Sequence, residues 1–245
     1  NAAGQTGDFW REKAPEHLLD AIDILPERFD AVIVDEGQDF QPNWWMPLEM
    51  INAHGDEGSM YVFYDPRQNL YVDQRGSIPA LGEPFKLPTN CRNTRAIAKK
   101  CGDILGVDIP TLASAPEGKV PDVLDLLSST QVRNRVSNLL DEWISKGKLR
   151  CSQVAILSPT KKEYGSIAGV FRLNNIELVT NIENWKEGKG VLFSTVKSFK
   201  GLEADAIVLI DVPEEFDDKY FTETDYYVAC SRAKHMITII RIARR

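Results

Sequence analysis

Two adjacent acids follow a short apolar run near the start of the chain, in a pattern that could hold a metal ion. Residues 31–34 read Ala-Val-Ile-Val, and Asp35 and Glu36 come directly after them. A continuous apolar run of this length is typical of a strand buried in a parallel sheet. Burying an unpaired ion costs several kcal/mol, so the end of this strand is expected to face a cleft, a cation or both.

Phosphoryl-transfer chemistry has a use for both acids. In such sites one acid at a strand end holds Mg²⁺, and a second acid beside it orients or deprotonates the attacking water. The acid pair alone could also be a chance match or have a structural role. Gln38 and Asp39, which follow it, make these two alternatives to a metal site much less favoured.

A second apolar stretch, residues 60–65, also ends in an acid, Asp65, and Gln68 follows it. Taken alone, Asp65 and Pro66 predict a turn and Gln68 a surface amide. If the two strands are neighbours, Gln68 would lie beside the same cleft as the acid pair. An amide in that place can sense a terminal phosphate.

Five segments of the chain, in this order, resemble the later motifs of superfamily 1 DNA helicases of the UvrD/Rep type. They read VDEGQDF, YDPRQNLY, LPTNCRNTRAIA, STVKSFKGLEADAIVL and YYVACSRAKHMI, and they extend from about Ala31 to Ile240. The ordered set is far more specific than any one of its members. The resemblance implies ATP and Mg²⁺ as cofactors and single-stranded DNA as a partner, with duplex junctions as a further candidate.

The resemblance also implies roles for the residues of the first two motifs. Asp35 matches an acid that binds Mg²⁺, and Glu36 matches the acid that activates water and lies at the same metal. Gln68 matches a glutamine that reports on the γ-phosphate. These three residues are therefore our candidates for catalysis and for nucleotide binding in the front part of the chain.

Three residues of the later motifs match nucleotide contacts by the same resemblance. Arg92 matches an arginine that reaches the γ-phosphate, Arg232 matches the arginine finger, and Glu203 matches an acid near the ribose. An arginine finger contributes about 10³–10⁵ in rate. Taken alone, each arginine would be interpreted as a member of a surface salt bridge. The KGLE segment around Glu203 would be interpreted as a simple turn.

Nucleic-acid contacts are expected in the fourth motif. Thr195 and Ser198 match positions that contact the nucleic-acid backbone, and Lys197 between them stands where the family usually has histidine. After Gln68 the family often carries an aromatic that stacks on a base, but this chain continues with residues 72–75, Val-Asp-Gln-Arg. Base stacking, worth about 1–3 kcal/mol per base, would have to come from elsewhere.

The phosphate-binding loop of the family, G-x-x-x-x-G-K-[ST], has no match in the sequence. The family places this loop upstream of the acid pair, so we expect the chain to be the C-terminal part of a longer helicase and inactive by itself. Its missing N-terminal part would then be a partner. About 100 residues separate Arg92 from Thr195, too few for a large inserted accessory domain, so translocation on single strands is a safer expectation than duplex separation.

The elements that must position these residues alternate between strand and helix, which predicts an α/β fold with parallel sheets and flanking helices. We expect residues 1–84 to be the C-terminal portion of a first RecA-like helicase domain and residues 85–245 to be a second RecA-like (P-loop NTPase-like) domain. The Gly- and Pro-rich residues 75–84 would link them. Helices are expected at 15–25, from 42, at 94–105, 131–146, 161–173 and 222–232. Strands are expected at 31–34, 60–65 and 122–127, and from 154, 191, 206 and 236.

Charge and composition restrict the function only coarsely. The 29 Lys/Arg and 36 Asp/Glu give a net charge of −7, which argues against a protein that binds nucleic acid non-specifically through positive charge. Residues 1–85 carry 5 Lys/Arg against 16 Asp/Glu, and residues 86–245 carry 24 against 20. This asymmetry fits two units with different partners, or two solvated faces. Because the cysteines are scattered and histidines are few, we do not expect a zinc site. The cysteines are expected to be reduced, which favours the cytoplasm as the compartment. No apolar run is long enough to span a membrane.

The function expected from these observations is ATP hydrolysis coupled to movement along single-stranded DNA, performed by the longer parent protein. The alternative is a non-catalytic helicase-like module used for binding or regulation. A scaffold would have no need for all six nucleotide-contacting residues, which argues against it. Of the two tryptophans after the acid pair, Trp44 and Trp45, one is expected in the core and the other packed against a neighbour, with nucleic-acid stacking as the less favoured alternative.

Overall fold

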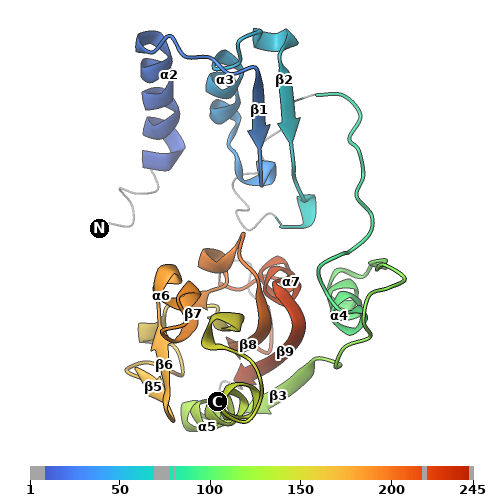
Figure 1. Cartoon of the computed structure of the whole chain (residues 1–245), viewed down its shortest axis with the longest axis vertical. Helices are drawn as coiled ribbons and strands as arrows, with labels where there is room; N and C mark the ends of the chain where they lie inside the picture. Colours follow the sequence, from blue (N-terminus) through green and yellow to red (C-terminus); the bar gives the residue numbers. More distant parts are fainter. Residues whose placement is uncertain (1–8, 69–77, 80, 217–219, 243–245) are drawn as a thin grey trace. The chain divides into compact units, whose positions relative to one another are not determined.

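The computed structural model describes residues 9–68, 78–79, 81–216 and 220–242, and it divides into two compact units. The first unit is Asn1–Lys86 and the second is Leu87–Arg245 (Figure 1). Part of the expected linker, residues 75–77 and 80, lies outside the described residues, as do residues 72–75, where the family's stacking aromatic was looked for. None of the helices within the described ranges is long and apolar enough to cross a membrane.

The described part of the first unit is built around two parallel strands. β1 pairs with β2 in parallel, with Val32 opposite Met60 and Val34 opposite Val62. Its elements are a π-helical turn (Phe9–Lys13), α2 (Ala14–Ile24), β1 (Ala31–Val34), α3 (Pro42–Met50), β2 (Ser59–Val62) and short 3₁₀ turns at Gly37–Asp39, Gly55–Glu57 and Pro66–Gln68. The strand expected at 60–65 therefore ends at Val62, although the Phe63 amide still donates to the Val34 carbonyl at 2.8 Å.

One face of this two-stranded sheet is packed and the other is bare. Val32, Val34 and Trp45 form the small core. On the opposite face Ile33, Tyr61 and Phe63 keep 70%, 57% and 53% of their surface exposed. Since parallel strands are normally covered on both faces, the described strands form only a part of a stable parallel sheet.

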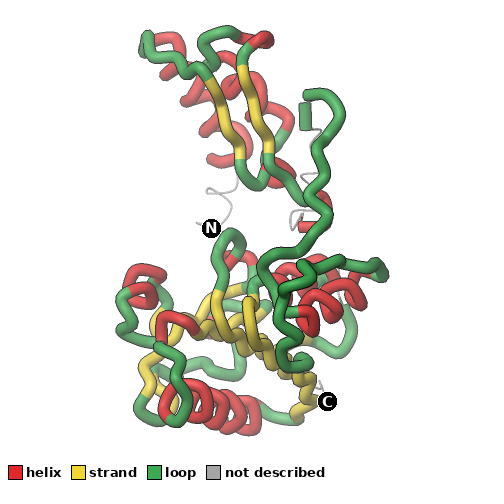
Figure 2. The backbone as a smooth tube through the Cα atoms, turned by 45° about the vertical axis from the view of Figure 1, so that its right-hand side comes forward, coloured by secondary structure: helices red, strands yellow, loops and turns green. Residues whose placement is uncertain are grey.

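The second unit is a mixed α/β domain with a seven-stranded, mostly parallel sheet. Among the described strands the order is β3-β9-β8-β4-β7-β6-β5, with the β5–β6 pair antiparallel and the other pairs parallel. Figure 2 shows the strands of this unit in yellow. Its elements are α4 (Arg95–Leu105), β3 (Asp122–Leu126), α5 (Ser129–Leu140) with a π-helical end (Asp141–Ser145), β4 (Val154–Ser158), β5 (Arg172–Leu173), β6 (Ile176–Val179), α6 (Ile182–Lys186), β7 (Val191–Thr195), β8 (Ala204–Val212), α7 (Glu223–Ser231) and β9 (Ala233–Ile242), with 3₁₀ turns at Cys151–Gln153, Lys162–Tyr164 and Lys197–Phe199.

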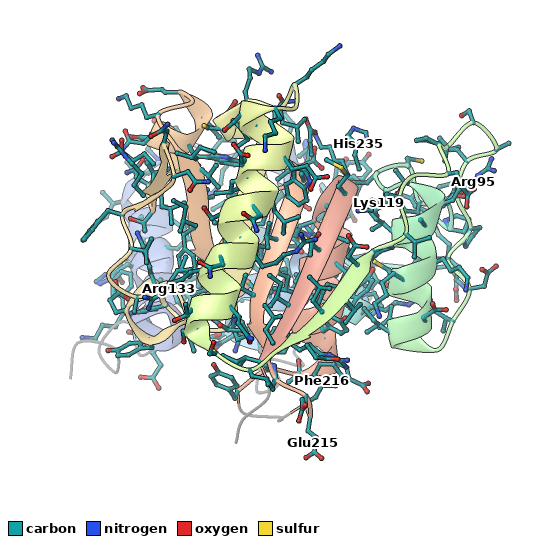
Figure 3. The ribbon with its side chains drawn as sticks, turned by 90° about the horizontal axis from the view of Figure 1, so that it is seen from below. Arg95, Lys119, Arg133, Glu215, Phe216 and His235 are labelled. Carbon is teal, nitrogen blue, oxygen red and sulfur yellow. The ribbon has the colours of Figure 1, made fainter. Side chains whose placement is uncertain are left out.

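Helices cover the sheet as the alternation of elements predicts. α5 lies across one face of the sheet (Figure 3). Val132, Val136 and Leu140 of this helix share a core with strand residues such as Ile156 and Val208. α4 and α7 pack on each other and on β9. The central strand β4 is buried at every position, which explains the apolar run of its first four residues. The predicted fold class is thereby confirmed.

The helix expected over 161–173 is wrong. The segment contains only the short turn Lys162–Tyr164 and then the β5–β6 hairpin. Gly169 adopts φ +72°, a left-handed conformation that breaks a helix. The Ser166 amide donates to the Asp211 carboxylate at 2.9 Å instead of to a carbonyl one turn earlier. A side-chain contact from 45 residues away thus replaces the helical hydrogen bond.

Candidate functional site

The acid pair lies at the carboxyl end of β1, in a tight turn. Glu36 has φ 53° and ψ 40°, a left-handed conformation that is uncommon for residues other than glycine. Its amide donates to Asp35 Oδ1 at 2.8 Å. Strained backbone of this kind is typically kept where function requires a particular side-chain direction.

Gln38 connects this turn with the end of the second strand. The Gln38 side chain is buried, and its Nε2 donates to Glu36 Oε2 at 2.5 Å. Its Oε1 accepts from the Asp65 amide at 2.9 Å. The Asp65 carboxylate in turn accepts from Gln68 Nε2 at 2.9 Å. The structure therefore brings Asp35, Glu36 and Gln68 to one edge of the sheet, through two residues that we had not assigned to the site.

The ligand chemistry at this edge fits a magnesium ion. Mg²⁺ prefers oxygen ligands, keeps several waters, and is usually held by one or two carboxylates together with substrate phosphates. Asp35 and Glu36 would supply those carboxylates. Within the described ranges no group of three or more His, Cys, Asp or Glu is arranged to enclose a metal by itself.

In the second unit, Arg92 and Glu203 meet although 111 residues separate them. Arg92 Nε donates to Glu203 Oε2 at 2.9 Å, and Lys234 Nζ lies 2.7 Å from Glu203 Oε1. The hydrogen bond from Lys234 lowers the pKa of the Glu203 carboxyl, and the positive charges of Lys234 and Arg92 lower it further. A carboxylate held between two cations stays ionised and can accept hydroxyl protons in hydrogen bonds.

Asn93 connects the Arg92 motif with the backbone around Arg232. The Asn93 side chain is buried, and its Nδ2 donates to the carbonyls of Ser231 and Ala233 at 3.0 and 2.5 Å. These two residues flank Arg232 on either side. The segment that follows Arg92 therefore holds the backbone that carries Arg232, and the two arginine motifs form one structural assembly.

Arg232 itself is 2% exposed, unlike the half-exposed Arg92. Its Nε and Nη2 both lie 3.3 Å from Ser231 Oγ. Arg232 follows the last residue of α7, and its carbonyl accepts from the Ala204 amide at the start of β8. The second unit thus buries this guanidinium at the amino ends of β8 and β9.

The candidate nucleic-acid contacts lie at the opposite edge of the same sheet. Thr195 is the last residue of β7, and its Oγ1 donates to Ser198 Oγ at 2.8 Å and accepts from the Ser198 amide at 3.1 Å. Lys197 is exposed in the turn between them. Because β7, β8 and β9 run in the same direction, this carboxyl edge is separated from the arginine assembly by the length of the strands.

Three functional candidates in the second unit were missed by sequence reasoning. Lys234 pairs with Glu203, Asn93 holds the Arg232 backbone, and Asn90 accepts from the amides of Arg92 and Asn93 at 2.9 and 3.1 Å. All three stand within two residues of a candidate arginine. Their closeness in the sequence to a candidate arginine was the signal by which these three residues could have been found.

The interpretation of the two tryptophans is confirmed. Trp45 is buried in the small core of the first unit, with 4% of its surface exposed. Trp44 is half-buried and packs edge-on against Phe40, with ring centroids 5.5 Å apart. Neither indole is presented as an open stacking surface.

Comparison with known proteins yields likenesses of structure only, since no family model and no curated protein matches the chain. It is similar to the C-terminal domain of a possible DNA helicase from Lactobacillus plantarum WCFS1, with a TM-score of 0.49 and 20% identity, covering 62% of this chain and 88% of that one. It is also similar to the PRRSV helicase, with a TM-score of 0.47 and 12% identity, covering 85% of this chain and 34% of the viral chain. This chain thus spans the smaller part of the viral helicase.

Proposed function

We propose that this chain is the C-terminal portion of an ATP-dependent superfamily 1 DNA helicase or translocase, whose intact form couples ATP hydrolysis to movement on single-stranded DNA. The observation that carries the proposal is the hydrogen-bonded cluster at the ends of β1 and β2. It joins Glu36, Gln38, Asp65 and Gln68, next to Asp35. Two acids and an amide, drawn from separate segments to one sheet edge, are the groups that hold the metal and orient the attacking water in hydrolysis of a phosphoanhydride.

In the first unit the acids and the glutamine have separate tasks. Asp35 would hold the magnesium ion, which would neutralise phosphate charge. Glu36 accepts the proton of the attacking water, and its bond from Gln38 orients the carboxylate. Gln68, restrained by Asp65, responds to the terminal phosphate. A change in the nucleotide is thus transmitted to both strand ends through Gln38 and Asp65.

In the second unit the cationic side chains recognise the nucleotide. Arg92 and Arg232 stabilise the charge that develops on the γ-phosphate, and Glu203 accepts a ribose hydroxyl. Because Arg92 is bonded to Glu203 in this structure, phosphate binding would exchange one anionic partner for another. Thr195, Lys197 and Ser198 contact the nucleic-acid backbone at the far edge of the sheet.

The bare sheet face of the first unit supports a missing N-terminal part. Ile33, Tyr61 and Phe63 form an apolar surface on one side of two parallel strands. A covering layer and further strands would come from the preceding part of the parent protein, which would also supply the phosphate-binding loop. The 245-residue chain by itself is then an inactive portion of the enzyme.

One observation favours a second candidate, a non-catalytic helicase-like module used for binding or regulation. Arg232 is almost fully buried, and its guanidinium lies against Ser231 within its own unit. A purely structural arginine would have the same surroundings. In this case the chain would bind nucleic acid without any nucleotide turnover in the parent.

The test is ATP hydrolysis by the intact parent protein, with and without single-stranded DNA. We expect DNA-stimulated turnover that Glu36→Gln and Arg232→Ala each reduce by at least about 10³-fold. Glu177→Gln, an exposed acid on β6, is the matched control and should leave turnover unchanged. A parent that contains a phosphate-binding loop and still hydrolyses no ATP on varied nucleic acids would favour the non-catalytic module.

A further inference from the structure

Residues 159–166, which follow β4, are anchored at both ends to the carboxyl edge of the second unit's sheet. The Thr160 amide donates to Ser158 Oγ at 3.2 Å. At the other end, the amide and hydroxyl of Ser166 both donate to the carboxylate of Asp211, and Arg133 Nε donates to the Ser166 carbonyl at 2.6 Å. Asp211 is buried and adopts φ 58°. A strained, buried acid thus fixes a surface segment that contributes little to the core.

Two aromatic rings on and just beyond this segment face water. Tyr164 is 81% exposed and Phe171 is 77% exposed. Lys162 Nζ lies 5.2 Å from the centroid of the Phe171 ring, a cation–π distance. Exposed aromatic rings offer flat faces on which the bases of a ligand can stack.

The positive charge of the second unit is concentrated here. Residues 87–245 carry 23 Lys/Arg against 20 Asp/Glu, a net charge of +3. Residues 158–172 and 195–200 together carry 5 Lys/Arg against 1 Asp/Glu, a net charge of +4. The remainder of the unit therefore has a net charge of −1. An anionic ligand would be drawn to this edge.

The segment lies beside the candidate nucleic-acid contacts. Ser158 is paired with Thr195 across β4 and β7, and the Val196 amide donates to the Ser158 carbonyl at 3.0 Å. The turn Lys162–Tyr164 also packs near β7. Tyr164, the two lysines before it and the Thr195–Ser198 turn thus lie near the carboxyl ends of β4 and β7. The Lys162 side chain connects them to the Phe171 ring, and the Phe171 carbonyl accepts from the Leu178 amide of β6 at 2.9 Å.

We propose that Tyr164 and Phe171 form a stacking platform for the bases of single-stranded nucleic acid, and that Lys161, Lys162 and Lys197 contact its phosphates. Exposed rings interleaved with basic side chains are the features that bind single strands without sequence preference. A duplex would hide its base faces within its own stack. The inference rests on the proposed function and supplies the aromatic contacts that the glutamine motif lacks.

The experiment measures binding of the 245-residue chain to a fluorescently labelled thymidine 20-mer by anisotropy at low salt. Tyr164→Ala and Phe171→Ala should each weaken binding about tenfold, whereas Tyr164→Phe should bind like the wild type because it keeps the ring. Lys162→Gln should make the dependence of affinity on salt concentration less steep. Phe85→Ala removes an equally exposed ring from the first unit and serves as the matched control.

The outcomes separate this inference from the proposed function. If the wild type binds and both ring variants bind equally well, the platform is refuted while nucleic-acid binding stands. If Phe85→Ala weakens binding as much as Tyr164→Ala, the effect is not specific to this edge and the inference fails. Absence of any binding by the folded wild-type chain overturns the platform, and ATP hydrolysis by the parent then decides the proposed function separately.

Discussion

At the scale of single residues, Asn93 shows how much one buried amide can organise. Its Nδ2 donates to the carbonyls on both sides of Arg232, and its Oδ1 accepts from Asn90 Nδ2 at 2.8 Å. Buried polar groups are stable only when they are paired in this way. The same amide therefore stabilises the unit and determines where the backbone of a candidate catalytic arginine lies.

Replacing Asn93 with alanine should lower the free energy of unfolding by about 3 kcal/mol, because two buried carbonyls lose their donor. Urea unfolding followed by circular dichroism measures the change. Asn138→Ala, the same substitution at an exposed site on α5, should change stability by less than about 0.5 kcal/mol. Equal effects of the two substitutions would contradict the role assigned to the Asn93 amide.

The Glu203–Lys234 pair predicts a dependence of stability on pH. The pKa of Glu203 is lowered from 4.5, chiefly by the hydrogen bond from Lys234, so the folded state holds this proton more weakly than the unfolded state. The contribution is therefore present above the ordinary pKa and is lost as pH falls through the lowered value. Lys234→Met should destabilise the chain at pH 7, and its difference from the wild type should shrink toward pH 3.

The control for this prediction is Lys99→Met, which removes an exposed lysine whose partner Asp103 lies 3.7 Å away on the same helix. Surface pairs of this kind contribute little, so we expect almost no effect at either pH. Unfolding midpoints in urea at pH 7 and pH 3 give the comparison. A Lys234→Met penalty that stayed constant between the two would show that the lysine acts through packing and not through its charge.

At the scale of elements, α7 depends on a capping box at its first turn. Thr222 Oγ1 accepts from the Asp225 amide at 3.0 Å, and Asp225 Oδ2 accepts from the Thr222 amide at 2.9 Å. These bonds satisfy amides at a helix start that have no partner within the helix. Since Arg232 follows the last residue of α7, the cap at one end of the helix helps to position the arginine at the other.

Thr222→Ala should destabilise the second unit by about 1–2 kcal/mol, because it removes the capping hydroxyl and a donor to the buried Asp225. Thr222→Ser keeps the hydroxyl and should retain most of the stability. Thermal melting monitored at 222 nm distinguishes the two. If serine and alanine were equally destabilising, the lost methyl group and not the cap would be the cause.

At the scale of the whole molecule, the two units differ in how complete they are. The second unit buries a large core between α5 and six strands, including Val136, Ile156 and Val208. The described core of the first unit consists of Val32, Val34 and Trp45 with a few half-buried neighbours. Burial of apolar surface is the main driving force of folding, so the units should not be equally stable.

We expect residues 87–245 to fold alone with a cooperative thermal transition. Residues 1–86 alone should show no cooperative transition and should self-associate through their bare sheet. Calorimetry and size-exclusion chromatography of the two separate pieces test both statements. A cooperative, monomeric first unit would contradict the view that its sheet is incomplete.

The sequence by itself was sufficient for the features that depend on local pattern. Apolar runs such as residues 154–157 marked the buried strands, because strands covered on both faces carry few polar residues. Helix starts such as that of α4, where the Thr94 side chain accepts from the Ile97 amide, were placed to within a residue or two. The order of the motifs similarly located the candidate site residues along the chain.

Only the tertiary structure decided which of these residues meet. Arg92 pairs with Glu203 across 111 residues, and Gln38 bonds to the Asp65 amide across 27. The segment 161–173 has residues that could form a helix, yet Asp211 binds it as a turn. Periodicity reports the local preference of the backbone, whereas these contacts depend on strand order and register, which no short stretch of sequence encodes. The candidate site residues could therefore be proposed one by one from the sequence, but their arrangement depends on the folded sheets.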